Sequence, residues 1–130
     1  MKILLPEGWP RPKGYSNGIA TGGRMIFTSG QVGWNENEEF EAKDLAGQVR
    51  QTMLNTLAVL REGGAGPKHI VRMTWYITDK QEYIDNLKDI GAAYREVIGG
   101  HYPAMSLLEV KSLLEDGAKV EIETTAVVEN

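Results

Sequence analysis

The sequence predicts a protein that mixes strands and helices, with two helices packed on one face of a β-sheet. Apolar residues recur at helical spacing in two stretches, one after Asp44 and one after Asp79. Short runs rich in strand-forming residues precede, separate and follow these stretches. No repeat, low-complexity tract or linker interrupts the chain, so one domain spanning residues 1–130 is expected.

Composition excludes several classes of protein. The apolar fraction of 42% and the charged fraction of 25% are typical of a soluble globular protein. The apolar run at residues 3–5 is too short for a signal peptide or a membrane helix, so a cytoplasmic protein is expected. The absence of cysteine excludes disulfides, thiolate metal sites and a cysteine nucleophile. A net charge of -4 lacks the positive footprint of nucleic-acid binding, so nucleic acid is not expected as the main ligand.

The first half of the chain predicts a strand, a helix and a second strand. "RMIFTSG" at 24–30 is a short apolar run that ends at glycine. A helix begins after Asp44, which can cap it, and ends at "GGAG", residues 63–66. Its apolar positions are Leu45, Val49, Met53, Leu57 and Leu60. "IVRMTWYIT" at 70–78 follows as a strand.

The second half predicts one amphipathic helix from near Asp79 to Ile98 and two closing strands, "MSLLEV" at 105–110 and "AKVEIETTAVV" at 118–128. In the first closing strand Met105 and Leu107 should point to one face and Leu108 and Val110 to the other. Both faces therefore carry apolar residues, although two helices cover only one. We expect a homo-oligomer that buries the remaining apolar sheet surface, including Leu107 and Val110.

Two glutamates on the last strand are candidate catalytic residues. Glu121 and Glu123 lie two residues apart, which places them on one face of the strand at roughly 6.6 Å along it. Carboxylate pairs in hydrolytic sites use such separations. The alternative is that alternating glutamates mark a solvated strand face.

Other polar and aromatic residues leave two interpretations open. Free backbone N–H groups at residues 28–31, which include Ser29 and Gly30, could hold an anion, although turn chemistry also explains these residues. Trp34 could line a pocket or serve packing. His69 and His101 lack partners at metal-binding spacing, so we expect surface or capping roles and no metal site.

Several segments together resemble the Rid family, also called the YjgF/UK114 or L-PSP endoribonuclease-like family. They are "GYSNG" (14–18), "MIFTSGQV" (25–32), "VRQTMLNTLAVLREGGAG" (49–66), "VRMTWYITD" (71–79), "YPAMSLLEV" (102–110) and "VEIETTAVV" (120–128). The resemblance covers nearly the whole chain in the right order. It implies a chorismate mutase-like α+β fold and a homotrimer in which the sheets form a barrel with ligand clefts between subunits.

The resemblance also implies an activity and its residues. Archetypal members hydrolyse reactive imines and enamines such as 2-aminoacrylate without a cofactor. The family tyrosine corresponds to Tyr15, the serine and glycine at the strand end to Ser29 and Gly30, and the glutamate that positions water to Glu121. The family asparagine on the second helix falls on Gly91.

The chain departs from the family pattern at the position that binds the substrate carboxylate. The arginine that binds the substrate carboxylate is replaced by Met105, and a pocket cysteine found in many members is replaced by Leu107. An uncharged methionine cannot offer the paired donors of a guanidinium, so another cation such as Arg24 or Lys111 would have to take over. Three functions follow as hypotheses: an imine or enamine hydrolase other than an archetypal 2-aminoacrylate deaminase, a non-catalytic metabolite-binding trimer, and an endoribonuclease, which the acidic charge disfavours.

Overall fold

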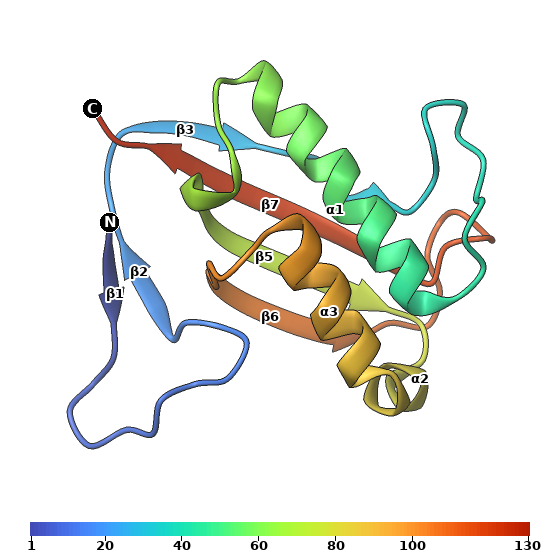
Figure 1. Ribbon diagram of the computed structural model, residues 1–130, viewed down its shortest axis with the longest axis horizontal. Coiled ribbons are helices and arrows are strands. Elements are labelled where there is room, and N and C mark those ends of the chain that lie inside the picture. The colour runs from blue at the N-terminus through green and yellow to red at the C-terminus, as the bar shows by residue number, and fades with distance from the viewer.

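The computed structural model describes residues 1–130 and shows a twisted β-sheet with its helices on one face (Figure 1). The elements are β1 (Lys2–Leu4), β2 (Gly18–Ala20), β3 (Arg24–Phe27), β4 (Gln31–Val32), α1 (Leu45–Glu62), the short 3-10 helix η1 (Pro67–His69), β5 (Ile70–Ile77), α2 (Lys80–Asp85), α3 (Leu87–Val97), β6 (Ala104–Glu109) and β7 (Val120–Val128). None of the helices combines the length and apolar character that a bilayer-crossing segment needs.

The main sheet has five strands in the order β3-β7-β5-β6, and β4 pairs with β7 beyond the end of β3. β5 and β6 run parallel, while the pairings of β7 with β3, β4 and β5 are antiparallel. A parallel pair needs a crossover connection, and α2 and α3 provide it between β5 and β6. α1 and α3 lie side by side over the same sheet face (Figure 1).

The helix predicted after Asp44 is confirmed. The Asp44 side chain accepts a hydrogen bond from the backbone N–H of Gly47, and Gly63 ends the helix. Of its predicted apolar positions, four are buried and Leu57 is half-buried against the core.

The prediction of one continuous second helix is wrong, because the helix is interrupted at Asn86. The Asn86 side-chain amide donates to the backbone carbonyl of Glu82 at 2.7 Å, and its backbone leaves the helical region at φ −120°, ψ 19°. Asparagine competes for backbone groups in this way and therefore favours helix ends. α2 and α3 consequently meet at an angle beside the sheet edge (Figure 1).

The N-terminal residues form a second, two-stranded sheet that the sequence did not predict. β1 and β2 pair antiparallel and lie away from the five-stranded sheet (Figure 1). The segment returns to the main body at Ser16, whose backbone N–H donates to Pro103 at 2.9 Å and whose hydroxyl donates to Tyr102 at 2.5 Å. This attachment brings residues 13–15 next to the start of β6.

The two faces of the sheet differ. Met73 pairs with Met105 and Trp75 with Leu107, which places all four side chains on the helix-covered face. The expectation that Leu107 belongs to the outer surface is therefore wrong, and the outward apolar residue of β6 is Leu108. Val110 lies beyond the end of β6, where its backbone N–H donates to Ile77.

The uncovered face carries large exposed apolar side chains. Met25 and Phe27 of β3 pair with Val127 and Thr125 of β7, on the face opposite the helices, and Phe27 is 66% exposed. Large apolar side chains without a covering layer support the expectation that copies of the chain associate.

Candidate functional site

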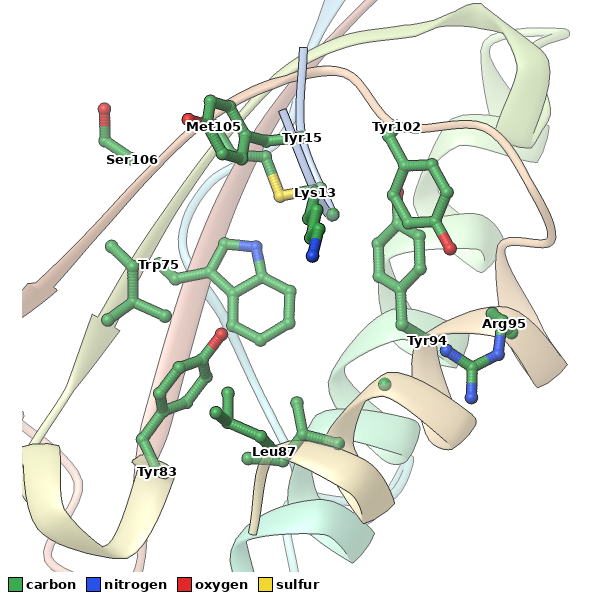
Figure 2. Close-up of a pocket in the computed structure, with 14 residues that line it drawn as sticks. Lys13, Tyr15, Trp75, Tyr83, Leu87, Tyr94, Arg95, Tyr102, Met105 and Ser106 are labelled. Atoms are coloured by element: carbon green, nitrogen blue, oxygen red, sulfur yellow. The ribbon is translucent and has the colours of Figure 1, made fainter. Parts of the chain in front are cut away.

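A pocket of about 500 Å³ lies between the β5–β6 edge of the sheet and helices α2 and α3 (Figure 2). Its volume falls in the range of about 300–1,000 Å³ that is usual for small-molecule sites. Strand residues Trp75, Met105 and Leu107 form one wall, and the loop that carries Lys13 and Tyr15 closes the side next to β6.

Helix α3 forms the opposite wall of the pocket. Residues three and four apart on a helix share one face, and this face of α3 is turned toward the pocket. Leu87, Ile90, Gly91 and Tyr94 recur at intervals of three and four and line the pocket. The Tyr94 ring stacks on Tyr102, with ring centroids 5.3 Å apart and planes inclined by 12°. The Tyr94 hydroxyl also donates to the His101 carbonyl at 2.6 Å, which fixes the ring in place.

The pocket is positively charged although the chain carries a net charge of -4. Its ionised lining residues are Lys13 and Arg95, and no carboxylate lines it. Neither cation forms a salt bridge. The three salt bridges in the structure join other residues: Met1–Glu129, Arg50–Glu96 and Lys119–Glu82. Burial raises the pKa of Tyr83 and of Tyr94, so both phenols stay protonated and neutral at physiological pH.

Trp75 contributes a buried polar group without a partner. The residue is 4% exposed, and its indole Nε1 makes no hydrogen bond. Figure 2 shows the N–H edge of the indole and the Lys13 ammonium turned toward the same part of the pocket. Buried donors are normally paired, so this orphaned N–H is a candidate ligand contact.

Gly91 leaves room for Arg95. A Cβ at position 91 would meet the Arg95 Nη1 at 3.2 Å, because the guanidinium folds back over the preceding turn of α3. The absence of a side chain at position 91 thus admits an arginine side chain beside the pocket.

The predicted site residues fall into two groups. Tyr15, Met105 and Leu107 line the pocket, and their role in ligand binding stays a prediction. Ser29, Gly30, Trp34 and Glu121 do not line it.

The separation follows from strand register. Glu121 pairs with Tyr76 of β5 and Val32 of β4, whereas Met105 pairs with Met73. Tyr76 and Met73 are three residues apart on β5, so they point to opposite faces of the sheet. Within one chain the sheet therefore separates Glu121 from Met105.

Gly30 and Glu121 do lie together. The Glu121 carboxylate sits against the Gly30 backbone so closely that a side chain at position 30 would collide with it. Glu121 is half-buried and its side chain has no hydrogen-bond partner. Glu123, by contrast, accepts a hydrogen bond from the Tyr76 hydroxyl at 2.8 Å, and this bond raises the pKa of Tyr76.

Turn and packing roles account for several other candidates. The Thr28 N–H donates to the Thr124 carbonyl at 2.9 Å, and the Ser29 hydroxyl accepts from the Gln31 amide at 3.0 Å, so this turn is occupied by its own hydrogen bonds. Trp34 packs against Phe40 with ring centroids 5.8 Å apart.

The histidines cap backbone groups, as predicted. His69 Nδ1 accepts from the Gly66 N–H at 2.9 Å, and His101 Nε2 donates to the Ile70 carbonyl at 2.6 Å. No group of three or more histidine or acidic side chains is placed to hold a metal ion.

The cations of the pocket were not the ones expected. Arg24 donates to the Gly63 carbonyl at the end of α1, and Lys111 does not line the pocket. The sequence carried a weak signal for the residues that do. Arg95 lies one turn after Gly91 on the pocket-facing side of the helix, and Lys13 stands two residues before Tyr15.

Fold and pocket together define an α+β protein with a pocket of small-molecule size at the edge of its sheet. Residues 10–128 match the family model described as Endoribonuclease L-PSP. The chain is 32% identical over 130 residues to the 2-iminobutanoate/2-iminopropanoate deaminase of Escherichia coli K12, covering 97% of each chain. A RutC family protein of Pyrococcus abyssi is 30% identical over 130 residues, covering 98% of each.

Solved structures agree. The Rid family protein YyfB of Yersinia pestis superposes with a TM-score of 0.85 at 32% identity, covering 98% of each chain. The YjgF gene product of E. coli gives a TM-score of 0.68 at 32% identity, again over 98% of each chain. The chain belongs to the Rid family, also called the YjgF/UK114 or L-PSP family. The expected chorismate mutase-like α+β fold is confirmed.

Proposed function

We propose that this protein is a Rid-type hydrolase of imine or enamine C–N bonds, a single domain that works as a homotrimer without a cofactor. The observation that carries the proposal is the state of Glu121: half-buried, unpartnered and pressed against the Gly30 backbone. A carboxylate free of protein partners can hold and deprotonate a water molecule. The near-complete match to a relative named an imino acid deaminase supports the same chemistry.

The reaction is a hydrolysis that balances with water alone. Glu121 takes a proton from water as the water oxygen bonds to the imine carbon, and this proton is then passed to the nitrogen. The resulting carbinolamine loses ammonia as the C–N bond breaks, leaving a ketone or keto acid. An enamine enters the same path after tautomerising to the imine. General-base help of this kind contributes about 10²–10⁴-fold to rate.

The catalytic site would form between subunits. Met105 and Glu121 occupy opposite faces of one sheet, so a cleft that contains the residues at both positions needs a second copy of the chain. Exposed Met25, Phe27 and Leu108 on the uncovered face supply apolar surface for that association. In this arrangement Tyr15, Met105 and Leu107 from one copy would face Ser29, Gly30 and Glu121 from the next.

Archetypal 2-aminoacrylate turnover should be slow. Met105 stands where the family arginine grips the substrate carboxylate, and a thioether offers neither charge nor N–H donors. A small imino acid bound at that position would leave its carboxylate without a charge partner.

A metabolite-binding trimer without turnover is the second candidate. The pocket favours it by its aromatic lining and its lack of any carboxylate. Trp34 is not part of this lining, so such a ligand would contact Trp75 and the tyrosines instead. An endoribonuclease activity fits less well with a net charge of -4.

Paired substitutions test the proposal. Imino acids generated in situ by an amino acid oxidase are assayed for hydrolysis above the spontaneous rate. Glu121→Gln should lower kcat by about 100-fold, whereas Glu123→Gln, at the carboxylate held by Tyr76, should change kcat by less than about threefold. Hydrolysis that survives Glu121→Gln, or no hydrolysis by the unaltered trimer of any imine tried, contradicts the proposal. The second result would favour the metabolite-binding trimer.

A further inference from the structure

We propose that the pocket beside α3 takes a carboxylic acid with an aromatic or bulky apolar body, whose carboxylate binds the Lys13 ammonium and the Trp75 indole N–H. This inference rests on the proposed function in one respect only, the class of substrate. If the protein is an imine hydrolase, its substrates would be imino acids with large side chains and not three-carbon imino acids. Lys13 and Trp75 would then bind the ligand carboxylate in place of the residue at position 105.

The polar partners of the carboxylate are unused in the free protein. Trp75 Nε1 is buried and unpaired, and the Lys13 ammonium forms neither a hydrogen bond nor a salt bridge. Both point toward one part of the pocket (Figure 2). A carboxylate has two acceptor oxygens, so it can satisfy an ammonium and an N–H together. Met105 lines the same pocket, and its unbranched side chain can rotate to admit the ligand.

Charge selects an anion. With Lys13 and Arg95 ionised, no carboxylate in the lining and protonated Tyr83 and Tyr94, the pocket attracts negative charge within an acidic protein. The Arg95 guanidinium adds to this field from the α3 side.

Size and lining select an apolar body. The cavity of about 500 Å³ is far larger than a three-carbon imino acid fills. Trp75, Tyr83, Leu87 and Met105 offer aromatic and aliphatic surface against which a ring can pack. Gly91 adds no side chain to the α3 wall, and the Arg95 guanidinium lies over it.

Phenylpyruvate, the keto acid released from the imine of phenylalanine, is the probe. Its binding to the assembled protein is measured by titration calorimetry beside pyruvate and the neutral isostere 1-phenylbutane-2,3-dione, in which an acetyl group replaces the carboxylate and the keto group is kept. Phenylpyruvate should bind at least tenfold more tightly than either, since pyruvate lacks the ring and the isostere lacks the charge. Equal affinity for phenylpyruvate and the isostere would overturn the carboxylate anchor, and equal affinity for pyruvate would overturn the apolar body.

Variants locate the ligand. Lys13→Met should weaken phenylpyruvate binding at least tenfold, and Lys88→Met, an exposed charge on α3 outside the lining, should change it by less than twofold. Trp75→Phe keeps an aromatic ring but removes the N–H and should weaken binding at least threefold. Gly91→Leu fills the pocket with a good helix former and should abolish binding in a folded protein. Wild-type affinity in Lys13→Met or in Gly91→Leu overturns the proposal.

The assay separates this inference from the proposed function. Phenylpyruvate binding that depends on Lys13, together with no imine hydrolysis, would retain the ligand class and refute the hydrolase. Imine hydrolysis with phenylpyruvate binding indifferent to Lys13→Met would retain the hydrolase and refute the ligand class.

Discussion

Gln48 ties helix α1 to the segment that leads into β7, the strand of Glu121. The residue is 1% exposed, and its side-chain amide donates to the carbonyls of Ala42 at 3.2 Å and Gly117 at 2.9 Å. Its side-chain oxygen accepts the backbone N–H of Lys119 at 2.8 Å. One buried side chain therefore satisfies three backbone groups from two loops.

Replacing Gln48 with leucine keeps the volume similar but removes all three hydrogen bonds. Each contributes about 1 kcal/mol net, so the free energy of unfolding should fall by about 3 kcal/mol. The entropy of unfolding is about 2.1 cal/mol/K per residue, which for 130 residues gives about 0.27 kcal/mol/K. The expected fall in Tm is therefore about 11 °C.

Differential scanning calorimetry at a fixed protein concentration measures this change, because association would otherwise shift Tm. Gln51→Leu is the matched control. Gln51 lies one turn further along α1, is half-buried, and donates one side-chain hydrogen bond, to Asn55 at 2.8 Å. The free energy of unfolding of Gln51→Leu should fall by about 1 kcal/mol or less. A Gln48→Leu shift below about 4 °C, or equal shifts for the two variants, would refute the reasoning.

Two further predictions concern the uncovered face. Because the Tyr76 pKa is raised by Glu123, folding favours the protonated phenol, and the stability this adds is present below pH 10 and lost as pH rises through the raised value. Ultraviolet titration should show one phenol moving toward an ordinary pKa in Glu123→Gln and disappearing in Tyr76→Phe; an unchanged titration in Glu123→Gln would contradict this. Phe27→Asp should convert the proposed trimer to smaller species in light scattering at micromolar concentration, whereas Leu114→Asp, at a side chain 92% exposed, should not. A stable wild-type monomer, or a Phe27→Asp trimer, would refute the proposed association.

Local signals explain why part of the fold was predictable. Helix α1 has a capping aspartate, regular apolar spacing and a glycine stop, and each of these acts within a few residues of chain. The break between α2 and α3 depends on the Asn86 side chain choosing the Glu82 carbonyl, which apolar spacing does not report. β1 and β2 have three residues each, too few to show an alternating pattern.

The candidate site likewise has features that single segments predict and features that depend on contacts between segments. Tyr15, Met105 and Leu107 could be singled out from the sequence because the family pattern encodes register along single segments, and all three line the pocket. The opposite placement of Glu121 and Met105 arises from pairing through β5, a relation between three strands that no single segment contains. For the same reason Lys13 and Arg95, on a loop and a helix far apart in sequence, were not recognised as neighbours of one cavity.

The Ser16 attachment bears on how this chain avoids aggregation. β6 is an edge strand, and the unpaired backbone of an exposed edge is a template on which other chains can polymerise. Ser16 forms an isolated parallel bridge to Ala104, so the N-terminal segment occupies the first rung of that edge. A chain shortened to begin after Ser16 would open this rung while leaving the five-stranded sheet intact. We expect such a product to expose the first backbone groups of β6 to pairing with another chain, and light scattering of the shortened chain beside the full-length protein would measure that association.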